Sequence, residues 1–322
     1  MILLWSLTLL ITITISAAFT TYYFGVASRR RLIISTTTSL YDTGLLDAIE
    51  EKFEKEYPID LYFISVGTSQ AIEHAKRGDA DLILVHAPSS ERAFLTSGYG
   101  ICRKIIAYNF FVIIGPSEDP AGIEGCNVKD ALTKIVKAGR EEKALWVSRG
   151  DESGTHLKEK ALWTLVGFNW TEIRKENWYV ESGTGMGKTI LIADEMEAYT
   201  LSDIGTYLKY YGDERISLKV MVSEEKPLLN VYSVIAVNPK QIHDVNFEDA
   251  ITFIKFLTSK KCQNLIANFK REIYGKSLFY PAVPLLRESP NSTIAQWIKE
   301  FAYFNGTECP EEYRDKHPEL YG

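Results

Sequence analysis

The chain has few of the residues that build metal centres, and it has no excess of positive charge. Its four cysteines, Cys102, Cys126, Cys262 and Cys309, show no Cys-x-x-Cys spacing, so we do not expect a metal site. The formal net charge is −6, whereas a nucleic-acid partner would favour a basic face. One or two disulfides would be compatible with export, and four cysteines allow three full pairings that the sequence does not distinguish.

Arrangements of residues for catalysis are also missing. The paired carboxylates Glu141 and Glu142 lie at a charged, solvated helix end, and no metal-ligand spacing accompanies them. The sequence contains no internal repeat and no low-complexity tract. We therefore expect a globular protein that is not an enzyme, needs no cofactor, binds no nucleic acid and is a monomer.

Charged residues are absent from positions 1–27, which are mostly apolar. About 20 apolar residues are enough to span a bilayer, so we expect an N-terminal membrane anchor or signal segment here, with the uncleaved anchor favoured. The basic cluster Arg29-Arg30-Arg31 follows this stretch, and the positive-inside rule would keep that side cytoplasmic. Large domains translocate despite flanking charge. We therefore expect an extracytoplasmic protein, anchored to the outer face of the cell membrane or secreted.

Short apolar runs then alternate with helical patterns. Asp81–Val85 is a continuous apolar run, typical of a strand in a buried parallel sheet, whereas Leu45–Tyr57 shows apolar residues at helical spacing. This alternation predicts right-handed crossovers and an α/β fold of doubly wound, mostly parallel sheets. We expect strands at 31–35, 60–65, 81–85, 108–115, 144–148, 178–180, 218–222 and 230–237, and helices at 45–57, 70–77 and 128–139, from 155, after 187, and at 247–257 and 294–304.

Two prolines divide the folded region into two lobes. Lobe 1 comprises 31–115 and 227–286, and lobe 2 comprises 116–226. The chain leaves lobe 1 near Pro116 and returns near Pro227, and two crossings of this kind form a hinge. Residues 287–322 form a C-terminal extension.

One local design occurs four times, twice in each lobe. A strand ends in a cluster of Ser, Thr and Gly, and a helix begins there. Capping of the helix explains any single cluster. Four such clusters at the carboxyl ends of strands indicate a ligand site, because helix N-termini offer free N–H groups and partial positive charge to anions. The clusters are Ser35–Ser39, Val66–Ser69, Ser153–Thr155 and Ser182–Gly185.

The third cluster also carries an arginine. Arg149 ends a strand just before a helix starts, and its guanidinium is a permanently charged fork of donors suited to oxyanions. Asp151 is expected to orient Arg149, because a buried arginine needs partners. His156 is expected in the first turn of the helix. His86, at the end of another strand, is a further candidate to line the cleft.

The fourth cluster nearly matches a nucleotide-binding loop. Ser182 to Thr189 resembles the pattern GxxxxGK[ST], but Ser182 occupies the first Gly position. The match also follows an export segment, where ATP is scarce. We therefore interpret this turn as part of an anion site rather than as a nucleotide-hydrolysing site.

The combined motifs resemble the TupA-type tungstate-binding proteins of ABC importers, over about 32–284. Each string alone is weak, and the combination is specific. The matching strings are Ser35–Ser39, Asp42–Leu46, Val66–Thr68, Gly78–Asp81, Val85–Pro88, Ser148–His156, Gly185–Gly187, Ala198–Leu201, Val234–Pro239 and Leu278–Pro281.

This resemblance implies a two-lobed type II periplasmic-binding-protein fold that delivers tungstate to a membrane permease and its ATPase. It implies oxyanion contacts from the Thr-Thr-Ser turn, the Gly-Thr turn and the arginine-containing turn. The predicted ligand-binding residues are Thr37, Thr38, Ser39, Thr68, Ser69, Arg149, Ser153, Gly154, Thr155 and Thr184.

Three alternatives to tungstate import stay open at this point. Molybdate is nearly isosteric with tungstate, so the preference for tungstate rests on the resemblance. Phosphate or sulfate is a second alternative, and monohydrogen phosphate would need an acceptor in the cleft, for which Asp42 and Asp151 are the candidates. The third is an oxyanion sensor or scaffold without a transporter.

Overall fold

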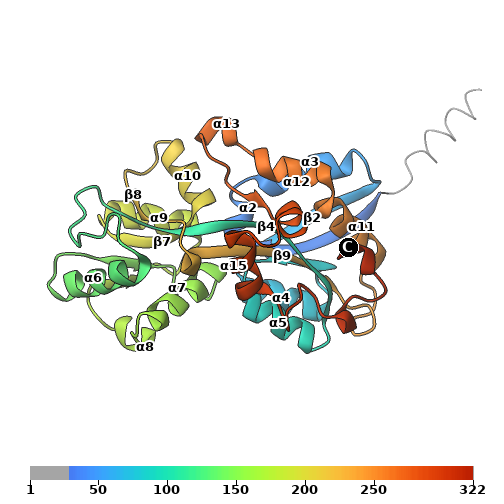
Figure 1. The fold of residues 1–322 in the computed structure, drawn as a ribbon, viewed down its shortest axis with the longest axis horizontal. Coiled ribbons are helices and arrows are strands. Elements are labelled where there is room, and N and C mark those ends of the chain that lie inside the picture. The colour runs from blue at the N-terminus through green and yellow to red at the C-terminus, as the bar shows by residue number, and fades with distance from the viewer. Residues whose placement is uncertain (1–28, 322) are drawn as a thin grey trace, which may run out of the picture.

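Two α/β lobes make up residues 29–321, the part of the chain that this computed structural model describes (Figure 1). The long strand β4 (Gly100–Gly115) runs through both lobes and joins their sheets. The other strands are β1 (Arg30–Thr37), β2 (Ile59–Val66), β3 (Leu82–Val85), β5 (Trp146–Ser148), β6 (Tyr179–Glu181), β7 (Tyr199–Asp203), β8 (Lys219–Val222), β9 (Leu229–Val237) and β10 (Tyr280–Pro281).

Helices cover the faces of both sheets (Figure 1). The α-helices are α2 (Thr38–Tyr41), α3 (Leu45–Glu54), α4 (Thr68–Arg77), α5 (Pro88–Thr96), α6 (Val128–Arg140), α7 (Gly154–Leu165), α8 (Trp170–Ile173), α9 (Met186–Glu195), α10 (Ile204–Gly212), α11 (Phe247–Thr258), α12 (Lys260–Asn268), α13 (Arg271–Tyr274), α14 (Ala282–Glu288) and α15 (Thr293–Ala302). Three short 3-10 helices are η1 (Lys226–Leu228), η2 (Glu311–Tyr313) and η3 (Pro318–Leu320).

In lobe 1 the strands β2, β1 and β3 are parallel neighbours, and β9 lies antiparallel between β3 and β4. The register pairs Thr37 with Val66, the last residues of β1 and β2. Parallel strands end at the same edge of a sheet. The hydroxyl-rich turns that follow these two strands therefore lie side by side.

In lobe 2 the strands β6, β5 and β7 are parallel, and β4 lies antiparallel to β7. Ser148 pairs with Glu181 at the ends of β5 and β6. The arginine-containing turn and the turn that resembles a nucleotide-binding loop are therefore neighbours too. The two-lobed α/β fold with doubly wound sheets, expected from the sequence, is confirmed.

The first crossing between the lobes lies inside strand β4, whereas the return crossing lies just before β9. In β4, Phe110 pairs with β9 in the lobe 1 sheet, and the next residue, Phe111, pairs with β7 in the lobe 2 sheet. The return crossing leads into β9 at Leu229. These pairings put the β4 crossing a few residues before Pro116, whereas the return crossing lies close to Pro227. The exact lobe boundaries stay a prediction.

Every strand and helix expected from the sequence is present, but some elements were not anticipated. Among them are α5, β7, α8, α10, α12, α13, β10, α14 and the first half of β4. The early part of β4 contains Arg103 and Lys104, which interrupt the apolar pattern. Both are buried because they form ion pairs, Arg103 with Glu91 at 2.7 Å and Lys104 with Glu308 at 2.6 Å.

The C-terminal extension packs against the crossing strands. Ile298 and Ala302 of α15 are fully buried in one cluster with Phe110 and Leu229. Further along, Glu308 accepts a hydrogen bond from Lys104. This part of the chain, which lies outside the family resemblance, is thus a folded component of the structure.

The predicted N-terminal anchor, residues 1–27, lies outside the described residues. Within residues 29–321 no helix is both long and apolar enough to cross a membrane. All four cysteines are described, and each carries a free thiol. Cys102, Cys262 and Cys309 are buried, and Cys126 is half-buried.

Candidate functional site

The turns singled out from the sequence lie at two facing edges, one on each lobe. The lobes touch between these edges. A Cβ atom on Gly154 of lobe 2 would lie 2.8 Å from the His86 ring and 3.1 Å from Thr68 Oγ1, both in lobe 1. The structure therefore describes the lobes closed around the predicted site.

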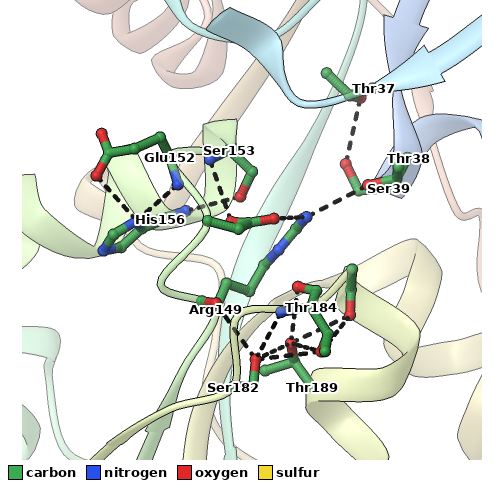
Figure 2. Close-up of polar contacts among 12 residues, drawn as sticks. Thr37, Thr38, Ser39, Arg149, Glu152, Ser153, His156, Ser182, Thr184 and Thr189 are labelled. Atoms are coloured by element: carbon green, nitrogen blue, oxygen red, sulfur yellow. Dashed lines mark hydrogen bonds and ion pairs between the residues drawn. The ribbon is translucent and has the colours of Figure 1, made fainter. Parts of the chain in front are cut away.

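The turn after β1 places three hydroxyls at the lobe boundary. Thr37 and Ser39 are buried, with 3.3 Å between their hydroxyl oxygens (Figure 2). Thr37 is the N-cap of α2, but its side chain makes no capping hydrogen bond. Thr38 Oγ1 accepts a hydrogen bond at 3.4 Å from Arg149 Nη2 of the other lobe. These hydroxyls serve contacts other than helix capping.

The turn after β2 supplies a buried hydroxyl without a partner. Gly67 is the N-cap of α4 and offers no side chain for capping. Thr68 is fully buried, and its Oγ1 has no hydrogen-bond partner among residues 29–321. The structure thus brings Thr68 against the other lobe, whereas it leaves the side chain of Ser69 exposed.

Arg149 follows β5 and points across the lobe boundary (Figure 2). Its side chain is 3% exposed and pairs with Asp151, so the expected orienting role of that carboxylate is confirmed. Arg149 Nε has no partner in the part of the chain that is described. A guanidinium N–H can only donate. This group is therefore available to an external hydrogen-bond acceptor.

The first turn of α7 lies directly behind the arginine. Ser153 is its N-cap and accepts a hydrogen bond from the His156 N–H at 3.3 Å, so the capping interpretation holds here. His156 Nδ1 accepts from the Glu152 N–H at 3.0 Å, which is consistent with a structural role in the first turn. Thr155 is buried, and its Oγ1 makes no hydrogen bond to any described residue.

The turn after β6 uses its hydroxyls internally. Ser182 Oγ lies 2.8 Å from Thr189 Oγ1 and 3.3 Å from Thr184 Oγ1 (Figure 2). The backbone of this turn also donates to the carbonyl of Arg149 at 2.9 Å. Lys188, the lysine of the pattern that resembles a nucleotide-binding loop, is exposed. The predicted ligand residue Thr184 thus belongs to a turn that supports the arginine, and its hydroxyl is already hydrogen-bonded.

His86, at the end of β3, is held as a hydrogen-bond acceptor. Asn109 Nδ2 donates to the Leu278 carbonyl at 3.2 Å, which fixes the orientation of this amide. Asn109 Oδ1 therefore faces Asn230 and accepts from its Nδ2 at 2.9 Å. Asn230 Oδ1 then accepts from the His86 Nδ1–H at 2.8 Å. This tautomer leaves a lone pair on Nε2, to which the Ser39 hydroxyl donates at 3.3 Å. Burial lowers the pKa of His86 to about 4, which keeps the ring neutral.

The nearby carboxylates are largely engaged or buried. Asp151 uses both oxygens to accept hydrogen bonds within its own turn. Asp203 is fully buried at the N-cap of α10. Burial raises the pKa of Asp42, while the charges of Lys209 and Arg149 partly offset this rise. Of the two acceptors considered for hydrogen phosphate, Asp151 is therefore already occupied.

Donors without partners characterise the lobe boundary. Among residues 29–321, six buried side-chain polar atoms lack a hydrogen-bond partner, and three of them are Thr68 Oγ1, Arg149 Nε and Thr155 Oγ1. Buried polar groups are nearly always hydrogen-bonded, so these three indicate a site for an acceptor. The N-termini of α4 and α7 add a favourable field for an anion. The same residues contain no group of three or more His, Cys, Asp or Glu that could hold a metal ion.

Lys209 makes a contact across the lobe boundary that was not predicted from the sequence. It lies on α10 of lobe 2 and donates to the carbonyl of Asp42 in lobe 1 at 2.5 Å. No motif marks this lysine, and α10 itself was not expected. The only sequence feature that could have pointed to Lys209 is its positive charge, which many surface residues share.

Comparison with known proteins identifies the family. Residues 25–261, well over half of the chain, match the family described as the PBP superfamily domain. The chain belongs to the PBP superfamily. The tungstate-binding protein TupA of Peptoclostridium acidaminophilum is 41% identical over 250 residues, which are 78% of this chain and 85% of that protein.

Two solved structures place this PBP-superfamily chain more narrowly. The tungstate-binding protein TupA from Desulfovibrio alaskensis G20 is 43% identical, with a TM-score of 0.67, over 78% of this chain and 98% of that chain. The structure described as the tungstate ABC transporter from Geobacter sulfurreducens is 40% identical, with a TM-score of 0.67, over 74% and 98%. The resemblance to TupA-type proteins is thus confirmed.

Proposed function

We propose that this protein captures tungstate outside the cytoplasm and delivers it to an ABC importer. The observation that carries the proposal is the set of three buried donors, Thr68 Oγ1, Arg149 Nε and Thr155 Oγ1, which lack partners at the boundary of the closed lobes. A small oxyanion can accept hydrogen bonds from all three. The 41% identity to a protein named for tungstate binding supports tungstate as this anion.

The other predicted residues fit around these donors. Thr37, Thr38 and Ser39 would add hydroxyl or backbone contacts from lobe 1, and Gly154 allows α7 to approach closely. Ser153 would act by capping α7, and Asp151 by holding Arg149. Thr184 supports the arginine-containing turn. The exposed Ser69 side chain would take no part in binding.

Protonation chemistry favours tungstate or molybdate over hydrogen phosphate. Tungstate carries no proton at neutral pH, so it needs donors and no acceptor. The carboxylate of Asp151, which could otherwise accept a hydrogen bond from hydrogen phosphate, is engaged by Arg149 and the Ser153 N–H. The preference for tungstate over the nearly isosteric molybdate rests on the TupA similarity.

Delivery needs partners on the membrane. In this proposal the protein acts as a monomer, and its closed form docks on an ABC permease whose ATPase drives transport. Residues 1–27 would keep the folded part at the outer face of the membrane. Binding and release, without a chemical step, are the whole activity.

Calorimetric titration of the full chain in detergent, with tungstate, molybdate, sulfate and phosphate, tests the proposal. We expect tight tungstate binding that Arg149→Ala weakens roughly 100-fold, because a charged hydrogen-bond donor is lost and Asp151 is left unpaired. Arg174→Ala is the matched control, since this lobe 2 arginine pairs with Glu181 at the surface. The absence of heat with every oxyanion would refute the proposal.

A further inference from the structure

Helix α10 of lobe 2 presents one face to lobe 1. Gly205, Lys209 and Gly212 occupy positions i, i+4 and i+7 of the helix, so they lie on the same side. A Cβ atom on Gly205 would come within 3.3 Å of the Thr43 methyl group, and one on Gly212 within 2.6 Å of the Tyr274 ring. The two glycines therefore permit a close approach that larger residues would prevent.

Lys209 lies between these glycines and makes a polar contact across the boundary. Its Nζ donates to the carbonyl of Asp42, a residue whose own N–H donates to the Thr38 carbonyl at 2.9 Å. The acceptor thus belongs to the turn that carries the predicted anion contacts of lobe 1. Lys209 reaches this turn from lobe 2 without being one of the proposed anion ligands.

We infer that α10 is a closure latch and that Lys209 is a positioning residue that slows release of the bound anion. This inference rests on the proposed function and extends it to the rate of release. The hydrogen bond to Asp42 exists when the lobes are closed and must break when they open. A contact that stabilises only the closed state shifts the equilibrium toward closure and thereby slows escape of whatever is enclosed.

A second lysine provides a matched control. Lys270 Nζ donates to the carbonyl of Thr43, the residue after Asp42, at 3.2 Å. Lys270 belongs to lobe 1, as does Thr43, so its hydrogen bond does not depend on closure. Both lysines are half-buried and bind neighbouring carbonyls of one turn, and they differ in whether the contact crosses the boundary.

Stopped-flow measurements on the full chain test the latch with tungstate as the probe. We expect Lys209→Met to raise the rate of tungstate release about ten-fold, as for loss of one charge-assisted hydrogen bond, with less than about a two-fold change in the association rate. Lys270→Met removes a positive charge that contacts the same turn, and it should leave both rates within about two-fold of the wild type. Lys209→Arg, which keeps a charged donor, should restore slow release.

A distance measurement without anion separates this inference from the proposed function. Spin labels on the half-buried Cys126 of lobe 2 and on Glu51→Cys, at an exposed position of lobe 1, report the separation of the lobes. Lys209→Met should shift the distances toward the open form relative to both the wild type and Lys270→Met. If no tungstate binds but this shift is seen, the proposed function fails and the latch stands. If Lys209→Met changes neither the distances nor, where tungstate binds, the rate of its release, the latch is overturned.

Discussion

Two neighbouring turns of lobe 2 have similar compositions but differ in whether their side-chain donors are hydrogen-bonded within the protein. The turn after β5 leaves Arg149 Nε and Thr155 Oγ1 without partners among the described residues. In the turn after β6, the hydroxyls of Ser182, Thr184 and Thr189 bond to one another. Hydroxyls already paired inside the protein gain little from an external acceptor. A cluster of Ser, Thr and Gly therefore indicates a ligand site only where folding leaves its donors unpaired.

The largest expected effect comes from blocking the contact between the lobes. Gly154→Ala would place a methyl group 2.8 Å from the His86 ring and 3.1 Å from Thr68 Oγ1. Overpacking of this kind costs up to about 3 kcal/mol, so we expect roughly 100-fold weaker tungstate binding by calorimetry. Gly185→Ala, at the N-cap of α9, meets no atom within 4 Å and should bind normally. Equal affinities of the two variants would contradict the closed geometry.

The next effect is the contribution of His86 to the pH dependence of the free energy of unfolding. The pKa of this ring is about 4 in the folded protein and about 6.5 in the unfolded chain. Between these values the unfolded state binds a proton that the folded state does not, so the free energy of unfolding falls as the pH falls through this interval. We expect His86 to account for about 2 kcal/mol of the loss between pH 7 and pH 4.5.

Urea unfolding at these two pH values measures the loss. His86→Gln should show a smaller decrease than the wild type, because glutamine does not titrate. His243→Gln serves as the control, since His243 is exposed. A decrease in His86→Gln as large as that of the wild type would show that this ring is not the group responsible.

The comparison between the two turns is tested most directly by removing hydroxyls. Thr155→Val should weaken tungstate binding roughly five-fold, the effect of losing one hydrogen bond of about 1 kcal/mol. The same change should raise the melting temperature of the anion-free protein, because it removes a buried hydroxyl that has no partner within residues 29–321. Thr68→Val should behave in the same way. A lower melting temperature for both variants would show that these hydroxyls are satisfied in the free protein.

The smallest effect is expected in the turn after β6. Thr184 Oγ1 lies 3.3 Å from both Ser182 Oγ and Thr189 Oγ1, so Thr184→Val should reduce stability by about 1 kcal/mol and change tungstate affinity less than about two-fold. Calorimetry and urea unfolding on the same preparation separate the two quantities. A loss of affinity as large as that of Thr155→Val would remove the distinction between the turns.

Much of the fold was predictable because its signals are local. The buried run Leu82–Val85 indicates a parallel strand, and helical spacing from Leu45 indicates α3. The first half of β4 escaped prediction because Arg103 and Lys104 interrupt its apolar pattern. Their ion pairs with Glu91 and Glu308 permit burial. Glu308 is distant in sequence from its partner Lys104, and Glu91 lies on a different element from its partner Arg103.

The candidate site was predictable to the level of the turn but not of the individual donor. Arg149, with Asp151 as its orienter, follows from the local sequence and is found as expected. Ser69 and Thr184 were named with the same reasoning, yet the Ser69 side chain is exposed and the Thr184 hydroxyl is engaged within its own turn. Whether a hydroxyl is buried and paired depends on the packing around it, which the residue type does not reveal.

By itself the sequence determined the longest and most regular strands and helices, the four polar turns and the arginine that accompanies one of them. These features depend on periodicity and on turn chemistry, which act between residues close in the chain. Only the tertiary structure decided which donors stay unpaired and which residues meet across the boundary. The contact of Lys209 with Asp42 joins residues 167 positions apart. Such contacts form only when two lobes close on each other, so no local pattern encodes them.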